Sequence, residues 1–271
     1  VKDEKGYINN RQDDDIILTT KNKDTGETET TSNTVTIDAK DGNTANVTLQ
    51  DVHIETKSSW NDSGSAPIEI KGNGDTKLEL NGNNTVLSGS KNHAGIEKAD
   101  VNGTGTLTIK DDVNDDGKLL AGGYEDSAGI GGGSYHDGKS YGNTSNITIT
   151  GGDITAVGGV YGAGIGGGSD EDASNIRIEG NADVAAFSNS GAGIGSGYFS
   201  NGNSDITITD HATVEAASAH GCGIGGGLLH YGKDTVTISG NASVHAEALD
   251  SAAAIGSERS SACLLYTSPS P

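Results

Sequence analysis

The chain has 271 residues and a formal net charge of −21. Only 32% of its residues are hydrophobic and 4% aromatic, too few for one large globular core, whereas glycine alone accounts for 43 residues. The negative charge disfavours nucleic acids and anionic membranes as partners. Because no apolar run is long enough to span a bilayer, we expect no membrane insertion by these residues.

Residues 1–32 are acidic and rich in threonine, with a single apolar patch at Ile16–Leu18. We expect this segment to form a leading strand, a cap, or the end of an upstream segment. The chain begins with Val1 and contains no methionine. We therefore expect it to be a fragment of a longer protein.

From residue 33 onward, apolar residues recur in short alternating pairs. Alternation with a period of two is typical of strands that bury one face. These pairs predict two or more irregular coils of strands before residue 93, and they are Val47/Leu49, Val52/Ile54, Ile68/Ile70 and Leu78/Leu80.

A short phrase, Ala-Gly-Ile-Gly, then recurs down the chain with small variations. Its isoleucines are separated by 29 to 35 residues, and they are Ile96, Ile130, Ile165, Ile194, Ile224 and Ile255. A period near 30 indicates a solenoid, in which each repeat buries its apolar face against its neighbours. Cys222 takes the place of the alanine in this phrase, so we expect it to be a buried small residue.

Two further columns align with this marker phrase. One is an alternating pair such as Ile147/Ile149, and the other is a β-branched residue followed two positions later by alanine, such as Val184/Ala186. Three short strands within about 30 residues must pair with equivalent strands in the neighbouring coils. The sequence therefore predicts an all-β fold, a right-handed three-sided parallel β-helix of about eight coils over residues 33–257.

Residues 258–271 follow none of these columns, and we expect no new strand there. The segment reads either as a linker or as translated adapter sequence at the end of a metagenomic contig. We exclude it from the functional argument.

An aspartate-rich loop at residues 112–117 resembles the first half of a calcium-binding loop. Asp112, Asn114 and Asp116 supply oxygen ligands at alternating positions, as calcium loops do. No helix pattern flanks the loop, and position 12 is Gly123 instead of glutamate. The loop is therefore rejected as an EF-hand but still predicts a Ca²⁺ site between two strands. The acidic loop at residues 170–172 is a second, weaker candidate, whose alternative is a solvated acidic turn.

Aromatic residues gather in the loops that follow the glycines of the marker phrase. Stacked loops would align these rings beside polar groups, as a sugar-binding surface requires. The alternative is that the rings merely cover the loops. The candidate glycan-binding residues are Tyr135, Tyr141, Tyr198, Phe199 and Tyr231, with Trp60 in an earlier loop. Tyr124 and Tyr161 lie at the neighbouring corner and are not part of this set.

Catalytic signals are sparse. Arg177 could serve as the base of a lyase-like reaction if it approached the acidic loop at residues 170–172, but an arginine near acids is more often a surface ion pair. The seven histidines show no spacing typical of a metal site or a catalytic triad.

The segments APIEIKGNGDTKLELNGNNTVLSG and GAGIGGG…NITITGGDITAVGG resemble the carbohydrate-binding, polysaccharide-lyase-like β-helix domains of bacterial surface proteins. The resemblance covers about residues 33–257. It implies an extracellular, secreted or cell-wall-anchored module that is not catalytic and binds a polysaccharide or host glycan, sometimes with Ca²⁺. The alternatives are the structural stalk of an adhesin and a Ca²⁺-dependent pectate-lyase-like enzyme, because β-helices carry all of these functions.

Overall fold

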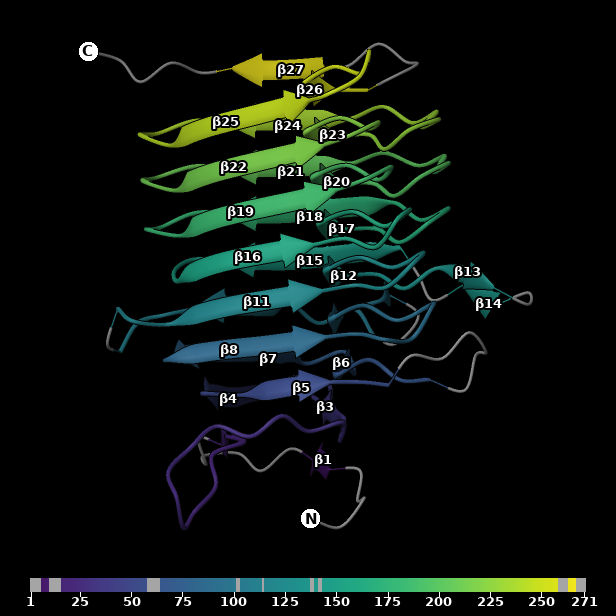
Figure 1. Cartoon of the computed structure of the whole chain (residues 1–271). Coiled ribbons are helices and arrows are strands. Elements are labelled where there is room, and N and C mark those ends of the chain that lie inside the picture. The colour runs from purple at the N-terminus through teal and green to yellow at the C-terminus, as the bar shows by residue number, and fades with distance from the viewer. Residues whose placement is uncertain are drawn as a thin grey trace.

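The strands of the protein stack in three parallel sheets along one rod (Figure 1). The structure is a computed structural model, and it describes residues 6–9, 16–57, 64–100, 103–113, 115–136, 139–140, 143–257 and 263–266. A two-stranded antiparallel hairpin, β13 (Tyr135–His136) and β14 (Lys139–Ser140), stands beside the sheets. The predicted three-sided parallel β-helix is therefore confirmed.

Sheet A contains the strands of the marker phrase. Ile130 pairs with Ile165, which pairs with Ile194, which pairs with Ile224, so the marker is in register from coil to coil. In spatial order its strands are β1 (Gly6–Asn9), β3 (Val35–Asp38), β6 (Ile68–Lys71), β9 (Ile96–Glu97), β12 (Ile130–Gly131), β17 (Ile165–Gly166), β20 (Ile194–Gly195), β23 (Ile224–Gly225) and β26 (Ile255–Gly256).

Sheet B contains the alternating apolar pairs, and sheet C contains the β-branched residues followed by alanine. In spatial order sheet B is β2 (Ile16–Leu18), β4 (Thr44–Gln50), β7 (Asp75–Asn81), β10 (Leu107–Lys110), β15 (Thr144–Ile149), β18 (Ala173–Ile178), β21 (Asp205–Ile208), β24 (Thr235–Ile238) and β27 (Cys263–Tyr266). Sheet C is β5 (His53–Glu55), β8 (Asn83–Leu87), β11 (Lys118–Gly122), β16 (Asp153–Val157), β19 (Asp183–Ser188), β22 (Thr213–Ser218) and β25 (Ser243–Ala248).

The core is a set of straight columns that run along the rod between the sheets. Each inward residue lies over its counterpart one coil away, because parallel pairing without a register shift keeps every column on one face. Cys222 is fully buried in the alanine column, as predicted. The marker column is equally buried at Ile96, Ile130, Ile165, Ile194 and Ile224.

The sheets extend beyond residues 33–257 at both ends. Strand β2 pairs with β4, which supports the leading-strand interpretation of Ile16–Leu18, and β1 adds a further strand. The expectation that the C-terminal segment begins no strand was wrong, since β27 pairs in parallel with β24. A sheet edge has unpaired backbone N–H and C=O groups, and a short extended segment can satisfy them.

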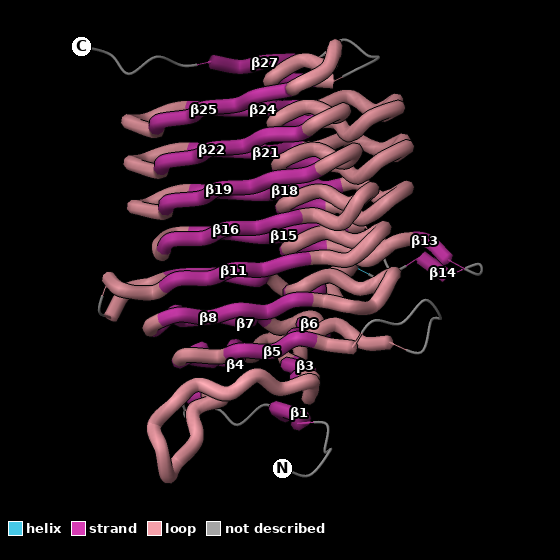
Figure 2. The backbone as a smooth tube through the Cα atoms, viewed as in Figure 1, coloured by secondary structure: helices cyan, strands magenta, loops and turns pink. Residues whose placement is uncertain are grey.

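The corner loops project mainly from one side of the rod, and the hairpin β13–β14 stands out on the same side (Figure 2). These are the connections from sheet C to sheet A and from sheet A to sheet B. Successive loops therefore form a continuous ridge on which side chains from different coils can meet. Within the described residues, no helix has the length and apolar character that a membrane crossing would need.

Candidate functional site

The loops after the marker strands β17, β20 and β23 repeat one backbone conformation. Asp170, Phe199 and Leu229 occupy the same position in these three loops, and their φ angles are 63°, 60° and 59°. A positive φ is uncommon for residues other than glycine. The loops therefore stack as copies, and the Phe199 amide donates a hydrogen bond to the Leu228 carbonyl of the next loop at 2.9 Å.

Four aromatic rings form a continuous row across three coils on this ridge. We call Tyr161, Tyr198, Phe199 and Tyr231 the aromatic strip. The ring centroids of Tyr161 and Tyr198 are 5.2 Å apart, those of Tyr198 and Phe199 6.0 Å, and those of Phe199 and Tyr231 5.9 Å. These separations are typical of interacting aromatic pairs. Tyr161, Phe199 and Tyr231 are 38%, 40% and 48% exposed, so the row faces solvent.

The structure brings together three of the predicted glycan-binding residues, Tyr198, Phe199 and Tyr231. Tyr135 lies in strand β13 of the projecting hairpin. Tyr141 and Trp60 lie outside the described residues, so their predictions stay untested.

Sequence reasoning placed Tyr161 at the neighbouring corner and left it out of the binding set. Tyr161 belongs to the corner after β16, yet its carbonyl accepts a hydrogen bond from the Tyr198 amide at 2.8 Å. That backbone contact brings the corner of one coil beside the loop of the next. The alignment of the repeats shows where Tyr161 and Tyr198 lie along the sequence, but it does not show that the corner and the loop are neighbours in the folded chain.

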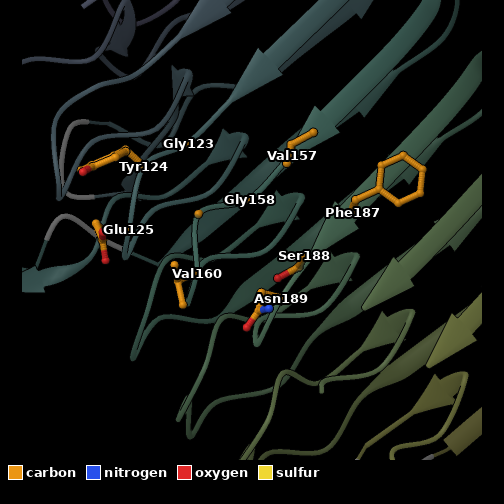
Figure 3. Close-up of a pocket in the computed structure, with 10 residues that line it drawn as sticks. Gly123, Tyr124, Glu125, Val157, Gly158, Val160, Phe187, Ser188 and Asn189 are labelled. Carbon is orange, nitrogen blue, oxygen red and sulfur yellow. The ribbon is translucent and has the colours of Figure 1, made fainter. Parts of the chain in front are cut away.

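A groove lies beside the strip and follows three successive corners between sheets C and A (Figure 3). Its volume is 460 Å³. Val157 and Phe187 line it from the ends of adjacent strands, and Val160 lines it from the corner itself. Tyr124, Glu125, Ser188 and Asn189 add polar groups. Since Tyr161 follows Val160, the groove and the aromatic strip meet at this corner.

A buried polar cluster lies beneath the strip. The Ser200 hydroxyl is 2.6 Å from His230 Nδ1, and His230 Nε2 is 3.0 Å from Asp234 Oδ1. Ser200 and His230 are 0% exposed and Asp234 is 1% exposed. The residue types are those of a catalytic triad, which the histidine spacing did not predict, but among the described residues His230 Nε2 makes no hydrogen bond. Because the hydroxyl is buried, a substrate could reach it only if the loops opened.

Carboxylates give this region an acidic character. Burial chiefly raises the pKa of Asp170 above its ordinary value, and the nearby Asp126 carboxylate raises it further. Burial also raises the pKa of Asp172, against the opposing effect of a hydrogen bond from the Gly202 amide. An anionic ligand on the strip would face these carboxylates, so the charge disfavours an anionic ligand.

The calcium prediction is neither confirmed nor contradicted. Asp112 Oδ2 is 2.6 Å from the Lys110 ammonium, and Asp116 Oδ1 accepts a hydrogen bond from the Gly82 amide at 3.4 Å. Asn114 lies outside the described residues. Over the part of the chain that the structure describes, no group of three or more His, Cys, Asp or Glu side chains is arranged to hold a metal ion.

Arg177 forms an ion pair with the acid two positions along the chain. Its guanidinium donates hydrogen bonds to Glu179 Oε2 at 2.7 and 3.2 Å. Both residues belong to one coil, and Arg177 is in β18 with its neighbours Ile176 and Ile178 buried. The arrangement is that of a surface ion pair, the alternative that the sequence left open.

Comparison with known proteins supports the architecture. A family model described as a beta helix repeat matches residues 147–169 and 206–228. Each match begins at the first isoleucine of a sheet B pair and ends in the loop after the marker phrase. No curated protein and no solved structure gives a significant match to the chain.

Proposed function

We propose that this chain is a glycan-binding β-helix and that the aromatic strip is its binding surface. The observation that carries the proposal is the row of four rings with centroids 5.2 to 6.0 Å apart, three of which belong to exposed residues. Aromatic rings offer apolar faces to the C–H faces of sugars, and tyrosine adds a polar tip. A row across successive coils suits an extended chain of sugar units, such as a polysaccharide or a host glycan.

The charge of the molecule argues against an anionic ligand. The net charge is −21, and Asp170, whose amide donates a hydrogen bond to the Tyr198 carbonyl at 2.7 Å, lies beside the strip with Asp126 near it. A polyuronate would be repelled by this surface, especially at low ionic strength. The proposal therefore favours neutral polysaccharides, and it includes an extracellular location, which the resemblance to bacterial surface proteins implies.

The test is a binding panel of soluble neutral, cationic and anionic polysaccharides, measured by isothermal titration calorimetry in Ca²⁺ and again in EDTA. We expect binding to a neutral member. Phe199→Ala or Tyr231→Ala should weaken it about two- to tenfold, since an aromatic contact contributes about 0.5–1.5 kcal/mol. Comparing Ca²⁺ with EDTA tests whether the loop at residues 112–116 has any role.

The control is Leu249→Ala, which removes a large apolar side chain that is 67% exposed outside the strip. It should leave the affinity unchanged. A Tyr124→Ala variant reports whether the ligand also enters the groove. Failure of every polysaccharide to bind would contradict the proposal and favour the stalk alternative, for which the long stack of coils is sufficient (Figure 1).

A further inference from the structure

The buried cluster beneath the strip links three successive coils. Asp172 Oδ1 accepts a hydrogen bond from the Gly202 amide of the next coil at 2.7 Å. Asp234 Oδ1 accepts one from the Ser204 amide of the preceding coil at 3.1 Å. The Ser200 hydroxyl and His230 Nδ1, 30 positions apart, join the same two coils at 2.6 Å. Among the described residues, His230 Nε2 and Asp234 Oδ2 are buried without a hydrogen-bond partner, so the bond between Ser200 and Nδ1 is the one that holds the His230 ring.

Two members of this cluster are sequence neighbours of strip residues. Ser200 follows Phe199, and His230 precedes Tyr231. The Tyr231 amide also donates a hydrogen bond to the Ser200 carbonyl at 3.1 Å. The contact between Ser200 and His230 therefore fixes the two backbone segments from which the Phe199 and Tyr231 rings project.

The backbone of Phe199 has the conformation that Asp170 and Leu229 adopt at the equivalent positions of the neighbouring loops. Its φ of 60° is uncommon for a bulky residue. Such conformations persist when the surrounding structure imposes them, and they gather at binding sites. Here the imposed conformation accompanies a ring that is 40% exposed and meets Tyr231 edge-on, with an interplanar angle of 85°.

We infer that Ser200 and His230 are positioning residues for the glycan site. Their buried hydrogen bond sets the relative placement of the Phe199 and Tyr231 rings. These two rings form the half of the strip that only a longer ligand contacts, because a shorter ligand can bind to Tyr161 and Tyr198 alone. This inference rests on the proposed function for its ligand, whereas the placement of the two rings can be measured without one.

The variant that isolates the contact is Ser200→Ala, which removes only the hydroxyl. Its matched control is Ser196→Ala, which breaks a second buried hydrogen bond of the same coil, the 2.6 Å contact between Ser196 and Ser204. Ser196 is as buried as Ser200 but is not adjacent to a strip residue. Thermal unfolding of both variants shows whether they are folded and equally destabilised.

The first readout is the nuclear Overhauser contact between the Phe199 and Tyr231 rings in the unliganded protein. We expect it to be lost or strongly weakened in Ser200→Ala and kept in Ser196→Ala. His230→Asn should keep more of it than His230→Ala, because the asparagine amide can take the place of Nδ1 toward Ser200. An unchanged contact in Ser200→Ala would overturn the inference, whatever the glycan result.

The second readout is affinity for a neutral oligosaccharide series of increasing length. Ser200→Ala should weaken long members about two- to tenfold, as Tyr231→Ala does, and leave the shortest binding members unchanged. In a double-mutant cycle, Ser200→Ala with Tyr231→Ala should lose no more than Tyr231→Ala alone. Additive losses, or equal losses at every length, would overturn the inference. If no member binds the wild type, the proposed function fails, and the ring contact alone decides whether Ser200 positions the strip.

Discussion

At the scale of single residues, the last glycine of the marker phrase is fixed by the coil next to it. Gly131, Gly166, Gly195 and Gly225 all have a φ between 124° and 137°. A Cβ on Gly195 would lie 2.0 Å from the Gly225 carbonyl oxygen. Glycine is therefore required twice here, for its backbone conformation and for the close approach of two coils.

We expect Gly195→Ala to destabilise the protein by about 3 kcal/mol, since strain at a positive φ adds to a clash that separates two strands of sheet A. Urea unfolding followed by circular dichroism would measure the loss. The control is Gly26→Ala, where φ is 73° and nothing lies within 4 Å of the added Cβ. Conformational strain alone should cost about 1 kcal/mol there. Equal losses for the two variants would show that the spacing between coils is not what selects glycine.

At the scale of the elements, the stacked loops hold ionisable groups at a cost in stability. The pKa of Asp172 is raised, chiefly by burial, above its ordinary value of 3.8. Between 3.8 and the raised value, the folded protein binds more protons at this site than the unfolded chain does. The contribution of Asp172 to stability therefore falls as pH rises through this window, and at neutral pH its carboxylate is destabilising.

We expect Asp172→Asn to gain stability on the order of 1 kcal/mol at pH 7, the scale of a single buried-polar substitution. The amide keeps an oxygen that can accept the Gly202 hydrogen bond. The gain should shrink as pH falls through this window and vanish below 3.8, where the wild-type carboxyl is protonated in both states. Urea unfolding over a pH series would measure it, with Asp205→Asn in an exposed position as control. A gain in stability that grows toward acid pH would contradict the conclusion that the Asp172 carboxylate is destabilising at neutral pH.

Sequence reasoning succeeds for elements that repeat and fails for contacts that cross between repeats. The columns through Ile194 and Val184 were predictable, because a fixed period places equivalent residues on one buried face. Tyr198, Phe199 and Tyr231 were predictable as a group for the same reason, since they occur in one class of loop. The repeat places Tyr161 at a neighbouring corner but carries no signal for its contact with Tyr198.

The buried cluster and the groove were not predictable from the repeat. His230 and Asp234 are four positions apart within one loop, and Ser200 belongs to another coil. The groove depends on Val157 and Phe187, which stand on the outer face of sheet C and read in the sequence as ordinary solvent-facing positions. Such features arise from the relative placement of loops, which no single period describes.

At the scale of the whole molecule, the solenoid is a sum of coils that contact only their neighbours. Ile194 pairs with Ile224, Val214 with Val244 and Ile206 with Val236, so one coil can replace another in every sheet. Ser200 and His230, at equivalent positions, are 30 residues apart. Removing residues 191–220 would therefore remove one whole period and join the two halves of the rod in register.

We expect this deletion variant to fold into a shorter β-helix, with an unchanged shape of its circular dichroism spectrum and a cooperative unfolding transition. It should lose glycan binding, because Tyr198 and Phe199 are removed and the Ser200–His230 contact goes with them. The matched control removes residues 191–205, which is half a period. After this deletion, polar residues that follow the junction would lie over the apolar columns of the preceding coil. That control should not fold. A half-period deletion as stable as the full-period one would mean that the aligned columns do not hold the rod together, whereas binding retained by the folded full-period variant would place the glycan elsewhere than on the aromatic strip.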